Sequence, residues 1–160
     1  MTMQTAETAV RHELVVNAPI ERAFNVFTEG YQTWNPPEHH IGEADIETSV
    51  MEPREGGRWY EIGVDGSQCD WGRVLAWGPP NRVVLAWMIS TQWKHDPDPA
   101  RASEVEVRFT AVDDGTTRVE LEHRHLDRHG EGWEGMSAAV ASPGGWPGSL
   151  EVYKERAEGR

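Results

Sequence analysis

Two histidines near the end of the chain have the spacing of a ligand handle or an acid–base pair. His123 and His125 are two residues apart in the alternating stretch Thr117–Leu126, so in a strand both side chains point to the same side. They continue the phase of Val119 and Leu121, which is the apolar side. Two imidazoles inside a cavity can bind a ligand oxygen, exchange protons or hold a metal. Core histidines with satisfied hydrogen bonds are the alternative.

A metal site at this histidine pair requires at least one more ligand. The sequence contains no HExxH or CxxC spacing that would supply it. We therefore expect neither a metal nor another cofactor.

Glu61 is a further candidate acid or base. It shares one side of its strand with Trp59, whereas Tyr60, Ile62 and Val64 share the other side. If Trp59 lines a cavity, Glu61 does too, and a buried carboxylate beside a histidine can transfer protons. The Tyr60 side is the more apolar one, so the pattern leaves open which side faces inward.

Other residue types that could do chemistry lack partners in the sequence. There is no G-x-S-x-G motif for a serine nucleophile, and Cys69 has no patterned neighbour. His39 and His40 lie in a polar loop, where we expect them to be solvated.

Eight tryptophans in 160 residues are the most unusual feature of the composition. Indole is bulky and flat, so a core crowded with it leaves irregular gaps that suit a flat ligand, although filling the core is the simpler role. The residues that we expect to contact such a ligand are Trp34, Trp59, Tyr60, Trp71, Trp87, Trp133 and Met136, with His123 and His125 as the polar groups.

The elements that position these residues follow from hydrophobic periodicity. A period of two, interrupted by turn sequences such as PREGG, DGS, GPPN and DDG, predicts seven strands joined mostly by hairpins, and therefore an antiparallel sheet. The predicted strands are Arg11–Asn17, Ala44–Met51, Gly57–Val64, Cys69–Trp77, Arg82–Ile89, Glu104–Val112 and Thr117–Leu126.

Helical periodicity occurs in two places. Residues from Ile20 to Phe27 recur at three- and four-residue spacing behind Pro19, and Gly30–Pro37 ends that short helix. The tail from Gly132 to Glu158 is helical again, interrupted at Ser142–Pro147. The order predicts an α+β fold in which a curved antiparallel sheet of seven strands wraps around a long C-terminal helix.

Composition limits the class of protein and its partners. The chain fits a single domain spanning residues 1–160, with a core of about 10–158. Its 27 acidic and 15 basic residues give a formal charge of −12, which disfavours nucleic acid and anionic membranes as partners. The single cysteine and an N-terminus without signal-peptide character lead us to expect a cytoplasmic protein, monomeric or homodimeric.

Several stretches in this order resemble the START-like (SRPBCC) helix-grip superfamily, and within it the branch named after the activator of the heat-shock protein 90 ATPase. They are FTEGYQTWNP at 27–36, EGGRWYEI at 55–62, WGRVLAWGPP at 71–80, TRVELEHRHLDRHG at 117–130 and GWPGSL at 145–150. The resemblance implies a helix-grip fold. It says less about function, because this fold hosts carriers, cyclases, hydrolases and co-chaperone modules.

Within that branch the chain is similar to the enediyne self-resistance proteins of antibiotic producers, which share the GGRWYEI stretch, the TRV-x-x-EH-x-H strand and the GWP motif. In that group a bound diradical takes hydrogen from a backbone glycine and the protein is destroyed. The resemblance assigns this sacrificial position to Gly115, in the turn AVDDGTTRV. An ordinary Asp-Gly hairpin turn with positive φ at the glycine is the alternative.

These observations favour a binding protein that encloses a small hydrophobic or aromatic, polyketide-like molecule, with self-resistance as one role. An enzyme on the same fold, a cyclase or hydrolase using histidine and glutamate, is the second hypothesis. A co-chaperone that binds a protein partner by its surface is the third.

Overall fold

The computed structural model describes residues 8–36 and 38–159. Residues 1–7, 37 and 160 lie outside this description, and they include most of the N-terminal stretch considered above. The described elements, in chain order, are β1 (Val10–Val16), α1 (Ile20–Phe27), α2 (Tyr31–Trp34), β2 (Ile46–Met51), β3 (Arg58–Gly63), β4 (Gln68–Gly78), β5 (Arg82–Trp87), the 3₁₀ turn η1 (Pro99–Arg101), β6 (Ser103–Asp113), β7 (Thr116–Arg124), the 3₁₀ turn η2 (Leu126–His129), α3 (Trp133–Ala141) and α4 (Trp146–Ala157).

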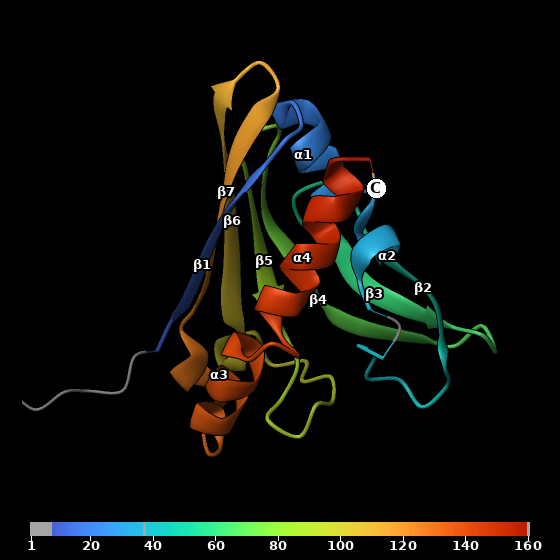
Figure 1. Ribbon diagram of the computed structural model, residues 1–160. Coiled ribbons are helices and arrows are strands. Elements are labelled where there is room, and N and C mark those ends of the chain that lie inside the picture. The colour runs from blue at the N-terminus through green and yellow to red at the C-terminus, as the bar shows by residue number, and fades with distance from the viewer. Residues whose placement is uncertain (1–7, 37, 160) are drawn as a thin grey trace, which may run out of the picture.

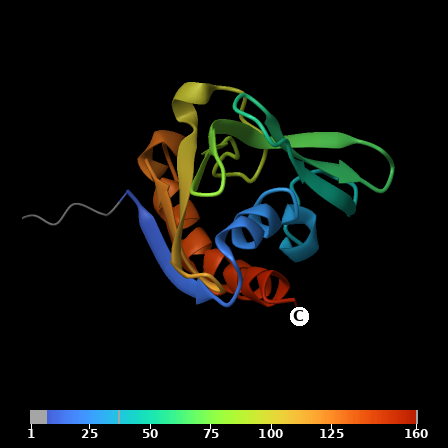
Figure 2. The same ribbon diagram turned by 90° about the horizontal axis from the view of Figure 1, so that it is seen from above.

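All seven strands form one antiparallel sheet, in the order β1-β7-β6-β5-β4-β3-β2. From β2 to β7, strands that are consecutive in the chain are also neighbours in the sheet, as hairpin connections require. β1 is added at the far edge, where Val10 pairs with His123 and Val16 with Thr117. Figures 1 and 2 show that the sheet is strongly curved and that α4 lies on its concave side. The predicted helix-grip fold is confirmed.

Irregular pairing in the middle of the sheet accompanies its curvature. The register shifts between Trp59 and Tyr60 in β3 and between Val74 and Ala76 in β4. Gly72 lies beside these shifts, and a Cβ atom there would be 1.7 Å from the carbonyl oxygen of Ala86. Bulges bend a strand, and a glycine permits the close approach of the neighbouring backbone.

The core between sheet and helices is built largely from aromatic rings. Tyr153 of α4 is fully buried, and its hydroxyl donates a hydrogen bond of 2.7 Å to the carbonyl of Ala23 in α1. Its ring packs edge-to-face on Phe27 at 5.2 Å, and Phe27 packs on Phe109 of β6 at 5.8 Å. These contacts fix α1 and α4 to each other and to the middle of the sheet.

The C-terminal helix is broken where the sequence predicts it. α3 ends at Ala141 and α4 begins at Trp146, with Pro147 in its first turn. A Cβ atom at Gly145 would be 2.3 Å from the carbonyl oxygen of Val140, so the break is tightly packed there.

Three sequence predictions need correction. Residues 30–37 end the first helix, but they also contain the short helix α2. The strand predicted for Arg82–Ile89 ends at Trp87. The strand predicted for Thr117–Leu126 ends at Arg124, because His125 has a left-handed backbone with φ of 59°. His125 therefore does not continue the inward side of His123, and that part of the prediction is wrong.

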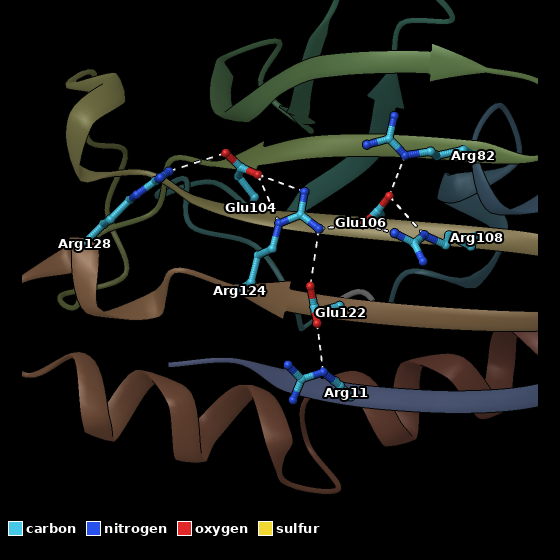
Figure 3. A network of polar contacts seen from close by, with 8 residues as sticks. All are labelled: Arg11, Arg82, Glu104, Glu106, Arg108, Glu122, Arg124 and Arg128. Atoms are coloured by element: carbon cyan, nitrogen blue, oxygen red, sulfur yellow. Dashed lines mark hydrogen bonds and ion pairs between the residues drawn. The ribbon is translucent and has the colours of Figure 1, made fainter. Parts of the chain in front are cut away.

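The outer face of β1, β7, β6 and β5 carries a network of ion pairs (Figure 3). At its centre is the buried Glu106, which accepts hydrogen bonds from three arginines. Burial alone would raise the pKa of Glu106, but these hydrogen bonds outweigh it and lower the pKa to about 2. The residues drawn in the network are Arg11, Arg82, Glu104, Glu106, Arg108, Glu122, Arg124 and Arg128.

Candidate functional site

A cavity of about 430 Å³ lies between the concave side of the sheet, α2 and the break between α3 and α4. This volume falls in the range of small-molecule sites, roughly 300–1,000 Å³. The residues that line it are Tyr31, Trp34, Asn35, Glu38, His39, His40, Ile41, Trp71, Trp87, Ile89, Trp93, Ala139, Val140, Ser142, Gly144, Gly145, Trp146 and Ser149.

One side of the cavity is a wall of indole rings. Trp71 of β4 packs edge-to-face on Tyr31 at 5.7 Å, and Trp87 of β5 packs on Trp146 of α4 at 6.0 Å. Trp34 is fixed by a hydrogen bond of 3.0 Å from its Nε1 to the carbonyl of Val26. Rings held in this way present flat apolar faces of defined orientation to a ligand.

Trp93 lines the same cavity from the loop between β5 and β6. Its side chain is 42% exposed, and it is the only exposed tryptophan among the described residues. Its φ of 62° is uncommon for a bulky residue. A tight turn holds it there, in which the Trp93 amide donates to Ser90 and the Ser90 amide donates to Lys94. Trp93 therefore forms an open part of the wall.

A polar side of the cavity lining comes from α2 and the segment that follows it, and it adjoins the ring of Trp71. The Tyr31 hydroxyl donates a hydrogen bond of 3.2 Å to Oδ1 of Asn35, and Nδ2 of Asn35 donates to the carbonyl of His39 at 3.4 Å. Burial raises the pKa of Tyr31 far above its ordinary value, so its phenol is neutral. This side offers hydroxyl, amide and imidazole groups to a ligand.

Glu61 is buried directly behind the polar side of the cavity. Its side chain is 2% exposed, and its Oε1 accepts hydrogen bonds from Nε1 of Trp71 at 2.7 Å and from the amides of Ile41 at 2.7 Å and Gly42 at 3.2 Å. Three N–H donors from distant segments thus converge on one oxygen of this carboxyl group. The inward side of β3 is thus the Trp59–Glu61 side, which settles the question that the sequence left open.

His40 lies between this carboxylate and the cavity. Its Nδ1 is 2.9 Å from the carbonyl oxygen of Gly42 and 4.0 Å from Oε2 of Glu61. The expectation that His39 and His40 are solvated is therefore wrong, because both are half-buried and line the cavity. Their position depends on how the 38–42 segment folds back on β3 and β4, and no sequence spacing indicates that contact.

His123 is fully buried behind Trp87 and Trp146 rather than in the cavity lining. Nε1 of Trp146 donates to its Nδ1 at 3.1 Å, so its proton lies on Nε2, which donates to Oγ of Ser103 at 2.8 Å. Ser103 in turn donates to Nε2 of His129 at 2.7 Å. Burial, with repulsion from His129, lowers the pKa of His123 to about 3, so the ring is neutral and holds Trp146 in place.

Some of the remaining residues suggested by the sequence line the cavity, and others are buried outside it. Trp34, Trp71 and Trp87 line the cavity. Trp59 and Met136 are buried outside its lining, Trp59 with its ring against Trp71 at 5.6 Å.

The other suggested positions lie outside the cavity lining. Tyr60 is on the opposite side of β3, under the guanidinium of Arg58 at 3.9 Å. Trp133 borders a separate shallow hollow beside β1. His125 is half-buried at the start of η2. Gly115 is exposed at the tip of the β6–β7 hairpin, and it is not among the described glycines with positive φ, so the Asp-Gly turn expected there is of another type.

The described residues contain neither a cluster of metal ligands nor a membrane-spanning helix. Among residues 8–36 and 38–159, no three His, Cys, Asp or Glu side chains are grouped so as to hold a metal ion. No helix in the same part of the chain has the length and apolar character needed to cross a membrane.

Comparisons with known proteins agree on the fold. The chain matches Txn09, an anthrahydroquino-γ-pyrone synthase whose structure was solved as a complex, with 40% identity, a TM-score of 0.66 and coverage of 92% of this chain and 95% of that one. It matches the self-sacrificing resistance protein CalC from Micromonospora echinospora with 28% identity, a TM-score of 0.67 and coverage of 94% of both chains.

A third solved structure is more distant. The Aha1 dimer from Colwellia psychrerythraea shares 15% identity, a TM-score of 0.63 and coverage of 94% of this chain and 96% of that one, a similarity of fold alone. No curated protein matches the sequence. The sequence model for activator of Hsp90 ATPase homolog 1-like proteins matches residues 17–156. The chain has a ligand-binding helix-grip fold, and it belongs to the activator of Hsp90 ATPase homolog 1-like family.

Proposed function

We propose that this protein binds a flat, hydroxylated polycyclic aromatic polyketide in its cavity and closes an oxygen-containing ring on it. The observation that carries the proposal is the mixed lining of the cavity, which combines indole faces with hydroxyl, amide and imidazole groups. A flat aromatic ligand with phenol groups on one edge matches both kinds of surface.

The similarity to Txn09 supports the choice of reaction. It extends over nearly the whole of both chains at 40% identity, and Txn09 is named as a synthase of an anthrahydroquino-γ-pyrone. A γ-pyrone fused to an aromatic ring closes by addition when a phenol oxygen bonds to the triple-bond carbon β to the ketone of an alkynyl ketone on the neighbouring substituent, because one C=C bond then remains in the new ring. Such a closure needs the substituent held against the phenol and a group that accepts the phenol proton.

The cavity can contribute both effects. Indole walls that are fixed by ring contacts and hydrogen bonds restrict a flat ligand to few orientations, which raises the effective concentration of phenol and ketone toward each other. Polar groups of the lining can accept hydrogen bonds from the ligand and donate them to it. The proposal requires a small-molecule partner and neither nucleic acid nor a membrane, and it suits a cytoplasmic monomer or homodimer.

The test is a reaction with a synthetic anthrahydroquinone that carries an alkynyl ketone beside a phenol, kept reduced under an inert atmosphere. Ring closure by addition leaves the mass unchanged, so liquid chromatography must separate substrate from product. We expect the protein to accelerate closure, and the same protein with Ala139 enlarged to Trp to lose the effect, because Ala139 lines the cavity. Equal rates with and without protein, in the presence of demonstrated binding, would refute the proposed reaction.

Self-resistance by binding is the second candidate, and the similarity to CalC favours it. Hydrogen transfer from a backbone glycine requires direct contact with the bound diradical. Gly115 is exposed at the hairpin tip and outside the cavity lining, so this role needs a ligand that reaches the hairpin. Treatment with an activated enediyne followed by mass spectrometry distinguishes the two candidates. Cleavage at Gly115 would support self-resistance, and an intact chain would oppose it.

A further inference from the structure

The imidazole of His40 has the surroundings of a general base in the cavity lining. His40 is one of the lining residues, and its Nδ1 is 2.9 Å from the carbonyl oxygen of Gly42. A carbonyl oxygen only accepts hydrogen bonds, so Nδ1 carries the proton and donates it to that bond. Nε2 is then left with the lone pair that can accept a proton from a ligand.

Behind this ring lies the buried carboxyl group of Glu61. All three hydrogen bonds to Glu61 end on Oε1, whereas Oε2 is the oxygen nearest to His40, at 4.0 Å. Gly42 makes the approach possible, because a Cβ atom there would be 2.9 Å from Oε2.

We propose that His40 is the catalytic base that removes the phenol proton of the bound aromatic ligand, and that Glu61 is a positioning residue that stabilises the resulting imidazolium. This inference rests on the proposed function. The O–H bond of the phenol breaks and its proton moves to Nε2 of His40. The phenolate oxygen then bonds to the alkyne carbon β to the ketone, and the displaced π-electron pair moves onto the ketone as an allenolate. The imidazolium returns the proton to the α-carbon of this allenolate, which leaves the C=C bond of the pyrone, so His40 is regenerated and no oxidant or reductant is consumed.

Glu38 and His39 are further titratable side chains of the cavity lining, Glu38 from an exposed position. The described ion pairs include none between His39 and a carboxylate, whereas His40 is 4.0 Å from Glu61. Cys69 lies near Glu61, and burial together with the charge of Glu61 raises the pKa of its thiol, so it stays neutral. The described cavity lining contains no lysine or arginine, so a phenolate formed there has the imidazolium of His40 as its nearby positive partner.

The test uses 2-hydroxyanthraquinone, a flat tricyclic probe with one free phenol whose ionisation shifts its visible absorption. Binding is measured by quenching of tryptophan fluorescence, and ionisation of the bound phenol by a pH titration of its absorption spectrum. The variants are His40→Asn, whose amide can still donate to Gly42, and Glu61→Gln, whose Oε1 can still accept the three N–H bonds. His125→Asn is the control, because His125 lies outside the cavity lining and asparagine tolerates its left-handed backbone.

In the wild type and in His125→Asn, we expect the apparent pKa of the bound phenol to fall by about one unit or more below that of the free probe, as for a group beside an opposite charge. His40→Asn should still bind the probe but lose this fall, and Glu61→Gln should reduce it. If Glu61→Gln does not fold, His40→Asn alone decides.

The outcomes separate the base from the proposed function. A wild-type protein that does not bind the probe would overturn the proposed function together with the role of His40. Binding without a fall in the phenol pKa, or the same fall in His40→Asn, would overturn the role of His40 alone. If the phenol pKa falls as far in Glu61→Gln as in the wild type, Glu61 is not the positioning residue for His40.

Discussion

The buried His123 should make the stability of the cavity wall sensitive to mild acid. The perturbation is His123→Phe, which keeps a ring of similar shape but removes the acceptor for Nε1 of Trp146 and the donor to Ser103. Because Trp146 lines the cavity at the start of α4, its indole loses a fixed orientation in the variant. An unpaired buried donor costs about 1–3 kcal/mol, and we expect a loss of stability of that size at pH 7.5.

The pH dependence follows from the pKa of His123, which burial lowers from 6.5 to about 3 in the folded state. The unfolded chain takes up the proton below pH 6.5 and the folded chain does not, so stability is present above that pH and is lost as the pH falls toward 3. For one such group the loss between pH 7.5 and 5.5 is about 1.4 kcal/mol. Lower pH is avoided because carboxylates then begin to titrate.

Urea unfolding at pH 7.5 and 5.5, followed by far-ultraviolet circular dichroism, measures this difference. The wild type should lose about 1.4 kcal/mol more than His123→Phe between the two pH values, so the gap between the two proteins narrows in acid. His129 also has a pKa lowered by burial, but it is present in both proteins and its effect cancels to first order. The control His125→Asn should keep the wild-type pH dependence. An equal pH dependence in wild type and His123→Phe would refute a neutral, buried His123.

Three further predictions concern the mouth of the cavity, the helix break and the outer face of the sheet. Trp93→Ala should weaken binding of 2-hydroxyanthraquinone about threefold to tenfold in a fluorescence titration, since it removes an exposed stacking partner. An unchanged affinity would show that Trp93 does not contact the probe. A Cβ atom at Gly144 has no neighbour closer than 3.8 Å, so Gly144→Ala should keep the unfolding temperature, and it should slow probe association in stopped flow if the break opens as a gate. Gly145→Ala should lower the unfolding temperature, because its Cβ meets the backbone of Val140. Unchanged probe association in Gly144→Ala would mean that the break does not open to admit the ligand. Glu106→Gln should lower the free energy of unfolding by about 1–3 kcal/mol at pH 7, and this difference from the wild type should disappear as the pH falls from 4.5 toward 2. A difference that persists in acid would show that the charge of Glu106 does not cause the stabilisation.

The sheet could be predicted from the sequence because its signals are local. Alternation of apolar residues and turn sequences located all seven strands, and proline with glycine located the helix break at 142–147. Where the local signal was balanced, the sequence left the inward side of β3 undecided. Tyr60, Ile62 and Val64 look more apolar than Trp59 and Glu61, yet they face outward, because the buried carboxylate is satisfied by donors from distant segments.

The polar side of the site was harder to predict because it depends on contacts between segments far apart in the sequence. The 38–42 loop folds back on β3 and β4 through hydrogen bonds to Glu61, which places His40 at the cavity. Nothing in the spacing of His40 and Glu61 indicates this pairing. His123 was correctly expected to be buried, but its hydrogen bonds to Trp146 and Ser103 hold it behind the wall instead of in the lining.

Binding of a flat aromatic molecule inside the cavity is the central claim, and the dissociation constant of 2-hydroxyanthraquinone tests it most directly. Isothermal titration calorimetry should compare the wild type with Ala139→Trp, which fills the cavity from the end of α3. We expect saturable one-to-one binding to the wild type and at least about tenfold weaker binding to the variant, a difference of about 1.4 kcal/mol or more. The unfolding temperatures of the two proteins should be similar. Equal affinity in a folded Ala139→Trp would contradict the claim, because the probe would then be bound outside the cavity.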